Sequence, residues 1–475
     1  MKDKNVLKFG TGGWRAVIAD EFTRRHVQVL SCALCEKLEA DGMLNRGIAI
    51  GYDRRFLSDV AAKWAAEVFA ARGCPVRVLK HAAPTPLIMY TVKNFDLPAG
   101  LAITASHNPA IYNGVKVFTR GGRDADETVT AQLEVFIDKV YDAEIPLMRY
   151  EEGIAKGVIS EIDPNNAYVD SILSSINTAA IREAELNAVL DPMFGVSKTS
   201  LQTILMTARC NVDVIHERHD TLFGGRLPSP NVNTLDALRA AVVENKADIG
   251  IATDGDADRL GVIDEQGRFL HPNEILVLLY YYLVRYKGWK GAAVRNLATT
   301  HLLDRVAEHL GETCYEVPVG FKHVSAKMTE VNAVIGGESS GGLTVRGHIA
   351  GKDGIYAASL LVEMMAVTGR KLSEMYKEIT DKLGEVFMCE RDYSFAAEIK
   401  PAVVKLLMED KKLPNFTSEV ERVSYMDGCK VYFKNGGWLV ARFSGTEPLI
   451  RIFCEMPDYK LAEEQCDLTK VFLGL

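Results

Sequence analysis

Three aspartates alternate along one short stretch, "TDGDADR", at Asp254, Asp256 and Asp258. Carboxylates this close together repel one another unless a cation neutralises them, and oxygen ligands of this kind suit Mg²⁺ or Ca²⁺. An EF-hand loop would have glycine at its sixth position, where this chain has Arg259, and would lie between helices rather than strands. The stretch therefore predicts a divalent metal site, with a solvated acidic turn as the alternative.

A second stretch, "TASHNP", places Ser106 at the end of an apolar strand and beside His107. Serine next to histidine suggests a nucleophile, as in a serine hydrolase or a phosphomonoesterase. However, the Gly-x-Ser-x-Gly elbow of the α/β hydrolases is missing, and adjacent residues rarely form a nucleophile–base pair. Taken by itself, the stretch is also compatible with a serine that only caps a turn.

Two further stretches carry groups of the kinds that can bind sugars and phosphates. "GGESSGG" offers a carboxylate and hydroxyls for sugar hydroxyl groups, although a flexible connector has a similar composition. "RFSGTEP" combines a guanidinium, two hydroxyls and a glycine, which suits a phosphate site but also a plain turn. A serine, a metal site, a polyol site and a phosphate site together predict phosphoryl transfer between a serine and a sugar.

The elements that must position these groups are short strands and amphipathic helices. "GLAIT", "ADIGIAT" and "NAVIGG" each run into one of the first three loops, and ligands gather where the strands of α/β sheets end. After about residue 386, Asn435-Gly436 lies between alternating strands and predicts a hairpin in a small α+β domain. We expect domain bounds of 1–150, 151–268, 269–385 and 386–475.

Composition restricts the class of protein. The chain has 475 residues, too many for a single core, and a formal net charge of −8, which argues against nucleic acid binding. The apolar run from Ile275 to Val284 is too short for a bilayer crossing and predicts a buried helix. Cys32 and Cys35 fall on a predicted helix, and the nine cysteines suggest free thiols in a reducing compartment. We expect a soluble, cytoplasmic enzyme, monomeric or homodimeric, with small-molecule ligands and no membrane contact.

In this order, and across essentially the whole chain, "TASHNP", "DGDADR", "GESSGG" and "RFSGTEP" resemble the four motifs of the α-D-phosphohexomutase family, the phosphoglucomutases and phosphomannomutases. "FGTGGWR" resembles the N-terminal arginine segment of that family. The resemblance implies three similar mixed-sheet α/β domains and a C-terminal α+β domain around a central active-site cleft. It also implies that Ser106 is stored as phosphoserine and that a hexose 1,6-bisphosphate is the intermediate and activator.

The resemblance implies roles for further residues. Mg²⁺ would be held by the three aspartates and an oxygen of phosphorylated Ser106, with Arg15 and Arg259 as nearby cations. Lys116 in "YNGVKVF" would be the general acid/base, with His107 as the rival. A buried lysine among cations is expected to have a lowered pKa. A solvent-facing lysine on an edge strand is the alternative.

The substrate contacts implied by the resemblance lie in the second half of the chain. Glu338 and Ser340 would bind the 3- and 4-hydroxyls of the sugar. The expected contacts to the non-reacting phosphate are Arg442, Ser444, Gly445 and Thr446, and further ligand contacts are expected from Lys322, His323 and Lys352.

One departure bears on the sugar. Bacterial dual-specificity phosphomannomutases and phosphoglucosamine mutases usually carry Gly-Glu-x-Ser-Gly-His, whereas Gly342 replaces that histidine here. The sequence favours glucose phosphates, with mannose as a second substrate; phosphoglucosamine mutase and, more remotely, a serine-dependent sugar phosphatase are alternatives. A binding protein without activity would need neither Ser106 nor the aspartates. A nucleotide-dependent kinase is disfavoured, because the sequence contains no Walker A motif.

Overall fold

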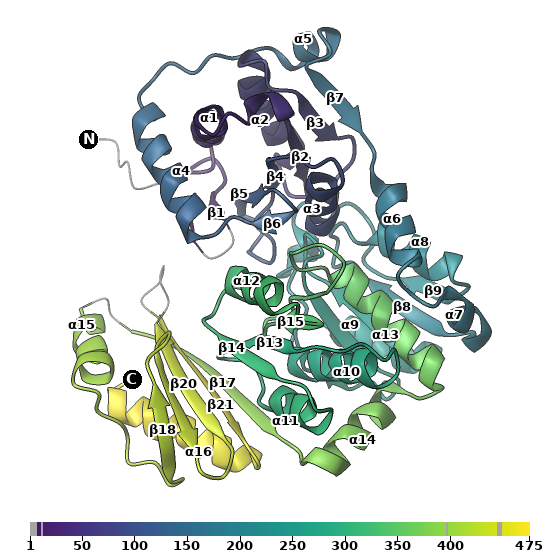
Figure 1. Cartoon of the computed structure of the whole chain (residues 1–475), viewed down its shortest axis with the longest axis vertical. Coiled ribbons are helices and arrows are strands. Elements are labelled where there is room, and N and C mark those ends of the chain that lie inside the picture. Colours follow the sequence, from purple (N-terminus) through teal and green to yellow (C-terminus); the bar gives the residue numbers. More distant parts are fainter. Residues whose placement is uncertain (1–6, 11–12, 396–397, 444–448) are drawn as a thin grey trace. The chain divides into compact units, whose positions relative to one another are not determined.

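Strands and helices alternate from Trp14 onward, as the sequence predicts, and the first of them build a seven-stranded sheet (Figure 1). The computed structural model describes residues 7–10, 13–395, 398–443 and 449–475. The strands of the first sheet are β1 (Trp14–Val17), β2 (Ile48–Tyr52), β3 (Val76–Leu79), β4 (Ala99–Ile103), β5 (Tyr112–Thr119), β6 (Arg123–Asp124) and β7 (Ile159–Ile162).

This first sheet is mixed, in the order β1-β5-β4-β2-β3-β7, with β6 beside β5. The strands β4, β2, β3 and β7 are parallel, whereas β5 is antiparallel to its three neighbours, β1, β4 and β6. Ile48 and Ile50 of β2 belong to the core that includes α1 (Arg24–Ala40) and α2 (Ser58–Ala71). Gly51 instead lies against Ile88 of α3 (Thr85–Asn94), so helices cover both faces. This explains why β2 and β4 are almost wholly buried and apolar.

A second mixed sheet repeats part of this design. Its order is β12-β11-β10-β8-β9, and its strands are β8 (Asn187–Asp191), β9 (Asn211–Val214), β10 (Ile249–Thr253), β11 (Leu260–Asp264) and β12 (Phe269–Leu270). As with β4 and β5, the buried strand β10 runs through a loop into an antiparallel partner, β11. The helices that pack on this sheet include α8 (Lys198–Thr207), α9 (Asp236–Asn245) and α13 (Gly354–Thr368).

The chain divides into two compact units. Unit 1 comprises residues 1–275 and 340–373, with both sheets described above, β16 (Leu343–Val345) and α13. Its other helices are α4 (Glu127–Val140), α5 (Tyr150–Ala155), α6 (Asn165–Leu173) and α7 (Thr178–Ala184). The expected boundary at residue 150 assigns β7 to the second domain, whereas its pairing with β3 attaches it to the first sheet.

Unit 2 comprises residues 276–339 and 374–475. Its first part contains the parallel strands β13 (Ala293–Asn296), β14 (Cys314–Val317) and β15 (Ile335–Gly337), with α11 (Leu302–His309) and α12 (Phe321–Val331). Two helices cross the division between the units, α10 (Pro272–Arg285) and α14 (Leu372–Leu383). The buried helix expected from Ile275 to Val284 is confirmed by α10.

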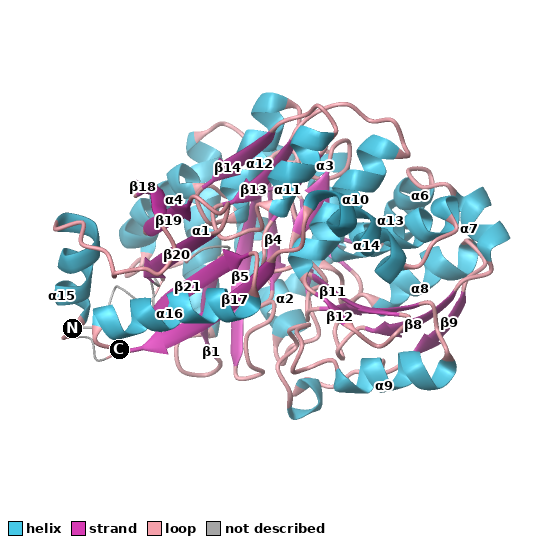
Figure 2. Cartoon of the chain, turned by 90° about the horizontal axis from the view of Figure 1, so that it is seen from below, coloured by secondary structure: helices cyan, strands magenta, loops and turns pink. Residues whose placement is uncertain are grey.

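The C-terminal part of unit 2 is an antiparallel sheet in the order β17-β21-β20-β19-β18. Its elements are β17 (Phe387–Ser394), α15 (Lys400–Val404), β18 (Val420–Ser424), β19 (Cys429–Phe433), β20 (Trp438–Phe443), β21 (Leu449–Met456) and α16 (Tyr459–Leu473). The hairpin expected at Asn435-Gly436 joins β19 to β20, and Gly436 takes a φ of 83° there. α16 packs along β17 and β21 (Figure 2). Three mixed α/β segments followed by an antiparallel α+β domain confirm the expected fold class.

The predicted Cys-x-x-Cys helix is α1, in which Cys32 and Cys35 are both buried. All nine cysteines lie in the described part of the chain and are free thiols. Among the residues that the structure describes, no helix combines the length and the apolar content that a bilayer crossing requires.

Candidate active site

Two loops of unit 1 come together although they are far apart in sequence. One joins β4 to β5 and carries Ser106; the other joins β10 to β11 and carries the three aspartates. The Ser106 hydroxyl donates a hydrogen bond to Oδ2 of Asp254 over 2.8 Å. Gly255 approaches the Ser106 carbonyl so closely that a Cβ there would lie 2.8 Å from that oxygen. The predicted meeting of the serine with the aspartate loop is therefore present within unit 1.

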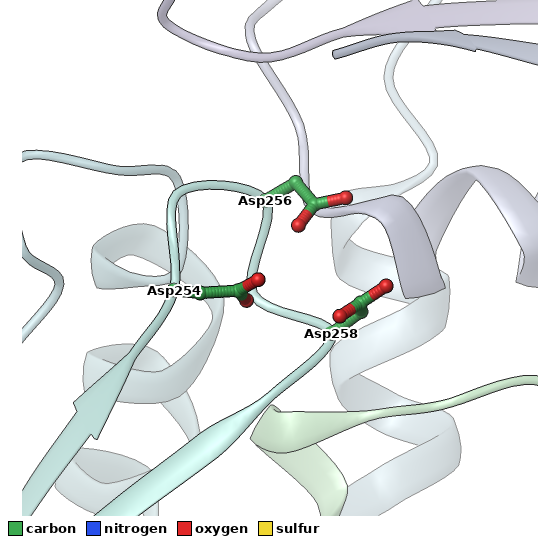
Figure 3. A group of neighbouring side chains, drawn as sticks. All are labelled: Asp254, Asp256 and Asp258. Atoms are coloured by element: carbon green, nitrogen blue, oxygen red, sulfur yellow. The ribbon is translucent and has the colours of Figure 1, made fainter. Parts of the chain in front are cut away.

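The three aspartates form a compact, buried cluster in which ligand oxygens lie within 4.8 Å of one another (Figure 3). Asp254, Asp256 and Asp258 are at most 2% exposed, which rules out a solvated acidic turn. Oδ1 of Asp256 and Oδ1 of Asp258 are buried and have no hydrogen-bond partner within the described ranges. Burial, reinforced by the two neighbouring carboxylates, raises the pKa of Asp254 to about 8. Buried, mutually repelling carboxylates with unpartnered oxygens fit a divalent cation.

Lys116 lies in the first sheet, on β5 opposite Ala102 of β4. Its Nζ donates to Oδ2 of Asp256 and to Oδ2 of Asp258, each over 2.6 Å. The lysine is 4% exposed and β5 lies between two strands, so the solvent-facing alternative is wrong. The expected lowering of its pKa is also wrong. Burial lowers the pKa of Lys116, but the attraction of Asp256 and Asp258 outweighs burial and raises the pKa overall.

Lys352 and Arg259 lie beside the aspartates, and Arg15 lies against the serine loop. Nζ of Lys352 lies 2.9 Å from Oδ2 of Asp258, and Nε of Arg259 lies 3.9 Å from Oδ1 of the same residue. The backbone N–H of Arg259 donates to Asp254 over 3.0 Å. Nη1 of Arg15, on β1, donates to Asn108 Oδ1 over 3.1 Å, which places this guanidinium on the serine loop.

His107 lies with its Nδ1 3.4 Å from the Ser106 hydroxyl oxygen. Burial lowers the pKa of His107 strongly, and the charges of Arg259 and Arg15 lower it further. A neutral imidazole therefore stands beside the serine. It is close enough to take part in proton transfer at Ser106, so His107 stays an alternative to Lys116 as the general acid/base.

The other expected ligand contacts are divided between the units. Glu338 follows β15 in unit 2, is 8% exposed, and accepts hydrogen bonds from Asn296 Nδ2 over 3.0 Å and from the Gly320 N–H over 3.1 Å. This anchored carboxylate does not fit a flexible connector. Ser340, two residues later, is exposed and belongs to unit 1.

The remaining predicted contacts lie in unit 2. Lys322 and His323 occupy the first turn of α12. Nε of Arg442, on β20, donates to Asp427 over 2.8 Å. Asp427 also accepts from the Val319 N–H over 3.0 Å and so ties this arginine to the segment before α12. Ser444, Gly445 and Thr446 lie outside the described residues.

Sequence reasoning missed several residues that contact the serine and aspartate loops. Thr85, at the start of α3, donates its hydroxyl to Asp256 Oδ2 over 2.6 Å. Asp53 and Arg55, just after β2, bond to the serine loop and its flanking residue Thr104. The available signal was positional, because "DRR" follows the apolar strand β2 in the same way as the predicted site loops follow their strands.

Comparison with known proteins agrees with this architecture. Four models of the phosphoglucomutase/phosphomannomutase family match in order: α/β/α domain I over residues 6–144, domain II over 166–267, domain III over 271–383 and the C-terminal domain over 398–469. A phosphoglucomutase/phosphomannomutase of Thermococcus kodakarensis is 29% identical over 463 residues, which is 97% of each chain. A Pyrococcus furiosus protein assigned as a phosphoglucosamine mutase is 31% identical and covers 96% of this chain and 95% of its own.

Among solved structures, a Thermus thermophilus protein described as a phosphomannomutase is 30% identical and superposes with a TM-score of 0.85 over 99% of both chains. Taken with the four family models, these matches show that the chain belongs to the α-D-phosphohexomutase family. It is a phosphohexomutase, an isomerase of the phosphoglucomutase/phosphomannomutase type.

Proposed function

We propose that the enzyme interconverts hexose 1-phosphate and hexose 6-phosphate through a phosphoserine at Ser106, with glucose as the favoured hexose and mannose as a second one. The observation that carries this proposal is the 2.8 Å hydrogen bond from the Ser106 hydroxyl to Asp254, inside a buried cluster of carboxylates and cations. A serine in this place suits storage of a phosphoryl group better than acyl transfer, because charge neutralisation and positioning dominate phosphoryl transfer.

The reaction is balanced over two transfers. In the first, a free hydroxyl of the hexose phosphate attacks the phosphorus of phosphorylated Ser106; the new P–O bond to the sugar forms and the P–Oγ bond to serine breaks. The proton of the attacking hydroxyl passes to a base, and Ser106 recovers a proton as it leaves. The resulting hexose 1,6-bisphosphate reorients, and Ser106 then takes the other phosphoryl group by the reverse steps. Neither water nor a nucleotide is consumed.

Asp254, Asp256, Asp258 and an oxygen of phosphorylated Ser106 would hold Mg²⁺, which would neutralise negative charge on the transferring phosphoryl oxygens. Arg15 of β1, whose guanidinium bonds to Asn108 of the serine loop, and Arg259, beside Asp258, add positive charge to the same centre. Both arginines bring that charge without needing to be reorganised during transfer, because β1 and the metal loop hold them in place.

Proton transfer is assigned to Lys116, with His107 as the alternative. Lys116 lies against two of the three aspartates, whereas His107 lies against the serine itself. Lys116→Gln and His107→Gln separate the assignments, because removing the true acid/base lowers kcat while the binding of hexose phosphate persists.

The substrate contacts are proposals carried over from the resemblance. Glu338 and Ser340 would bind the sugar hydroxyls, with Lys322 and His323 as further ligand contacts. Arg442, Ser444, Gly445 and Thr446 would hold the phosphate that does not react. Lys352 would contact the ligand from the metal side, since its amino group lies at Asp258.

Gly342 supports glucose over glucosamine, because the usual phosphoglucosamine mutase signature carries histidine in that place. A second candidate is phosphoglucosamine mutase itself, which the name of the Pyrococcus furiosus relative favours. A coupled assay with catalytic hexose 1,6-bisphosphate, comparing the 1-phosphates of glucose, mannose and glucosamine, separates these functions by their kcat/KM values. Glucosamine 1-phosphate as the preferred substrate would overturn the sugar assignment.

Ser106→Ala tests the carrier itself. The variant should keep its fold and lose mutase activity by several orders of magnitude, since no other residue replaces the phosphoryl carrier. Ser174→Ala, at the C-terminal end of α6, is the matched control and should retain full activity. Turnover by the Ser106 variant would contradict the proposal, and net release of inorganic phosphate by the wild type would favour a phosphatase.

A further inference from the structure

Arg55 is fully buried just after β2 and binds the backbone of the serine loop with both terminal nitrogens. Nη2 donates to the carbonyl oxygen of Ser106 over 2.5 Å and to that of Asn108 over 2.7 Å. Nη1 donates to the carbonyls of Pro109 over 2.9 Å and Tyr112 over 3.1 Å. One planar guanidinium therefore holds four carbonyl groups across seven consecutive residues of this loop.

Asp53 supports the N–H side of Ser106, through Thr104. Its Oδ1 accepts from the Arg55 N–H over 2.9 Å and from the Ser58 hydroxyl over 2.8 Å. Its Oδ2 lies 3.2 Å from Nε of Arg55 and accepts from the Thr104 hydroxyl over 2.6 Å. Thr104 Oγ1 in turn accepts from the Ser106 N–H over 2.8 Å. The N–H and the C=O of Ser106 are thus tied to the same buried ion pair.

Ser106 needs this support because its backbone is strained. Its φ is 52°, in the left-handed region that L residues with a side chain seldom occupy. This conformation turns the serine so that its hydroxyl reaches Asp254. The Phe223 ring covers the guanidinium of Arg55, with the central carbon 4.8 Å from the ring centroid. The ring helps to exclude water from the hydrogen bonds between Arg55 and the serine loop.

We propose that Arg55 is a positioning residue for phosphoryl transfer, which holds Ser106 in its left-handed conformation so that the hydroxyl faces the three aspartates. The proposal rests on the function proposed above. Lysine cannot replace this arginine, because an ammonium group has three donors around one nitrogen, whereas the guanidinium spreads five donors over a planar fork.

Arg55→Lys therefore keeps the positive charge and removes the four-carbonyl hydrogen-bond pattern that only the guanidinium can make. The experiment follows incorporation of labelled phosphate into Ser106 from hexose 1,6-bisphosphate, together with kcat and KM for hexose 1-phosphate. We expect incorporation and kcat to fall by about 100-fold, the loss that misplacing a reacting group by about 1 Å causes. KM should change little, because Arg55 is not expected to touch the sugar phosphate. Arg54→Lys, whose parent side chain bonds to the Glu217 carbonyl, is the neighbouring control and should behave as wild type.

Circular dichroism and the melting temperature separate positioning from folding. A purely structural role would lower the melting temperature and leave the folded fraction with normal kcat, which would overturn the inference. An Arg55→Lys enzyme that raises KM at unchanged kcat would overturn it as well. If Arg55→Lys does not fold, Asp53→Asn decides: it keeps the side-chain volume, removes the charge that orients Thr104 and Arg55, and should lower kcat at constant KM. Wild-type enzyme that never acquires phosphate on Ser106 would instead refute the proposed function.

Discussion

Gly342 has no room for even a methyl group, because the side chain of Lys352 passes through that space. A Cβ at position 342 would lie 2.2 Å from Cδ of Lys352, 2.9 Å from Cγ and 3.5 Å from Cε. Carbon atoms pack at about 3.5–4.0 Å, so Gly342→Ala must push the lysine stem away by more than about 1 Å. The amino group, 2.9 Å from Asp258 Oδ2, would then leave that carboxylate.

The expected size of the effect follows from this lost contact. A hydrogen bond between charged groups contributes about 1.5–3 kcal/mol. Each 1.36 kcal/mol corresponds to a factor of ten in rate, so kcat/KM should fall by roughly 10- to 150-fold. The coupled mutase assay measures this directly, and Gly342→Ala should resemble Lys352→Ala.

The double variant provides the critical control. If Gly342→Ala acts only by displacing Lys352, then adding it to Lys352→Ala should change nothing further, since the displaced side chain is already gone. Wild-type kcat/KM in Gly342→Ala, or effects that multiply in the double variant, would refute the reasoning.

Two other predictions address the metal cluster and the thiols. Mg²⁺ should raise the melting temperature of the wild type and not of Asp256→Asn, because a ligand that binds only the folded state stabilises that state. Chelation of Mg²⁺ should stop turnover. An equal shift of the melting temperature in both proteins would contradict the metal site. The native thiols should react slowly with a chromogenic disulfide reagent at pH 8, and all nine should react in guanidinium. Burial raises the pKa of Cys210 and of Cys429 to about 11, which leaves little of the reactive thiolate, so rapid native reaction at the rate of free cysteine would count against the buried thiols.

The sequence was informative where chemistry is local. The aspartates of "TDGDADR" are close in the chain, so their repulsion, and hence the need for a cation, could be inferred before any fold was known. The strands before the serine loop and the aspartate loop could also be predicted, since β4 and β10 are short, continuous apolar runs. Order along the chain then supplied the family resemblance.

The errors and omissions concern contacts between distant residues. The pKa of Lys116 depends on which charges lie nearest, and the sequence does not show that two carboxylates lie at 2.6 Å. Arg55 acts on backbone carbonyls more than fifty positions away, so no spacing of side chains marks it. The departure at Gly342 could be noticed in the sequence, but the close approach of the Lys352 side chain to this glycine required the structure.

The pairing of β7 with β3 matters to anyone who would express the N-terminal domain separately. A fragment that stops at residue 150 removes β7 and turns β3 into an open sheet edge with unpaired backbone N–H and C=O groups. Such an edge invites strand addition by other molecules and aggregation. A cut after the last residue of β7, Ile162, leaves the sheet of that domain with all of its own strands.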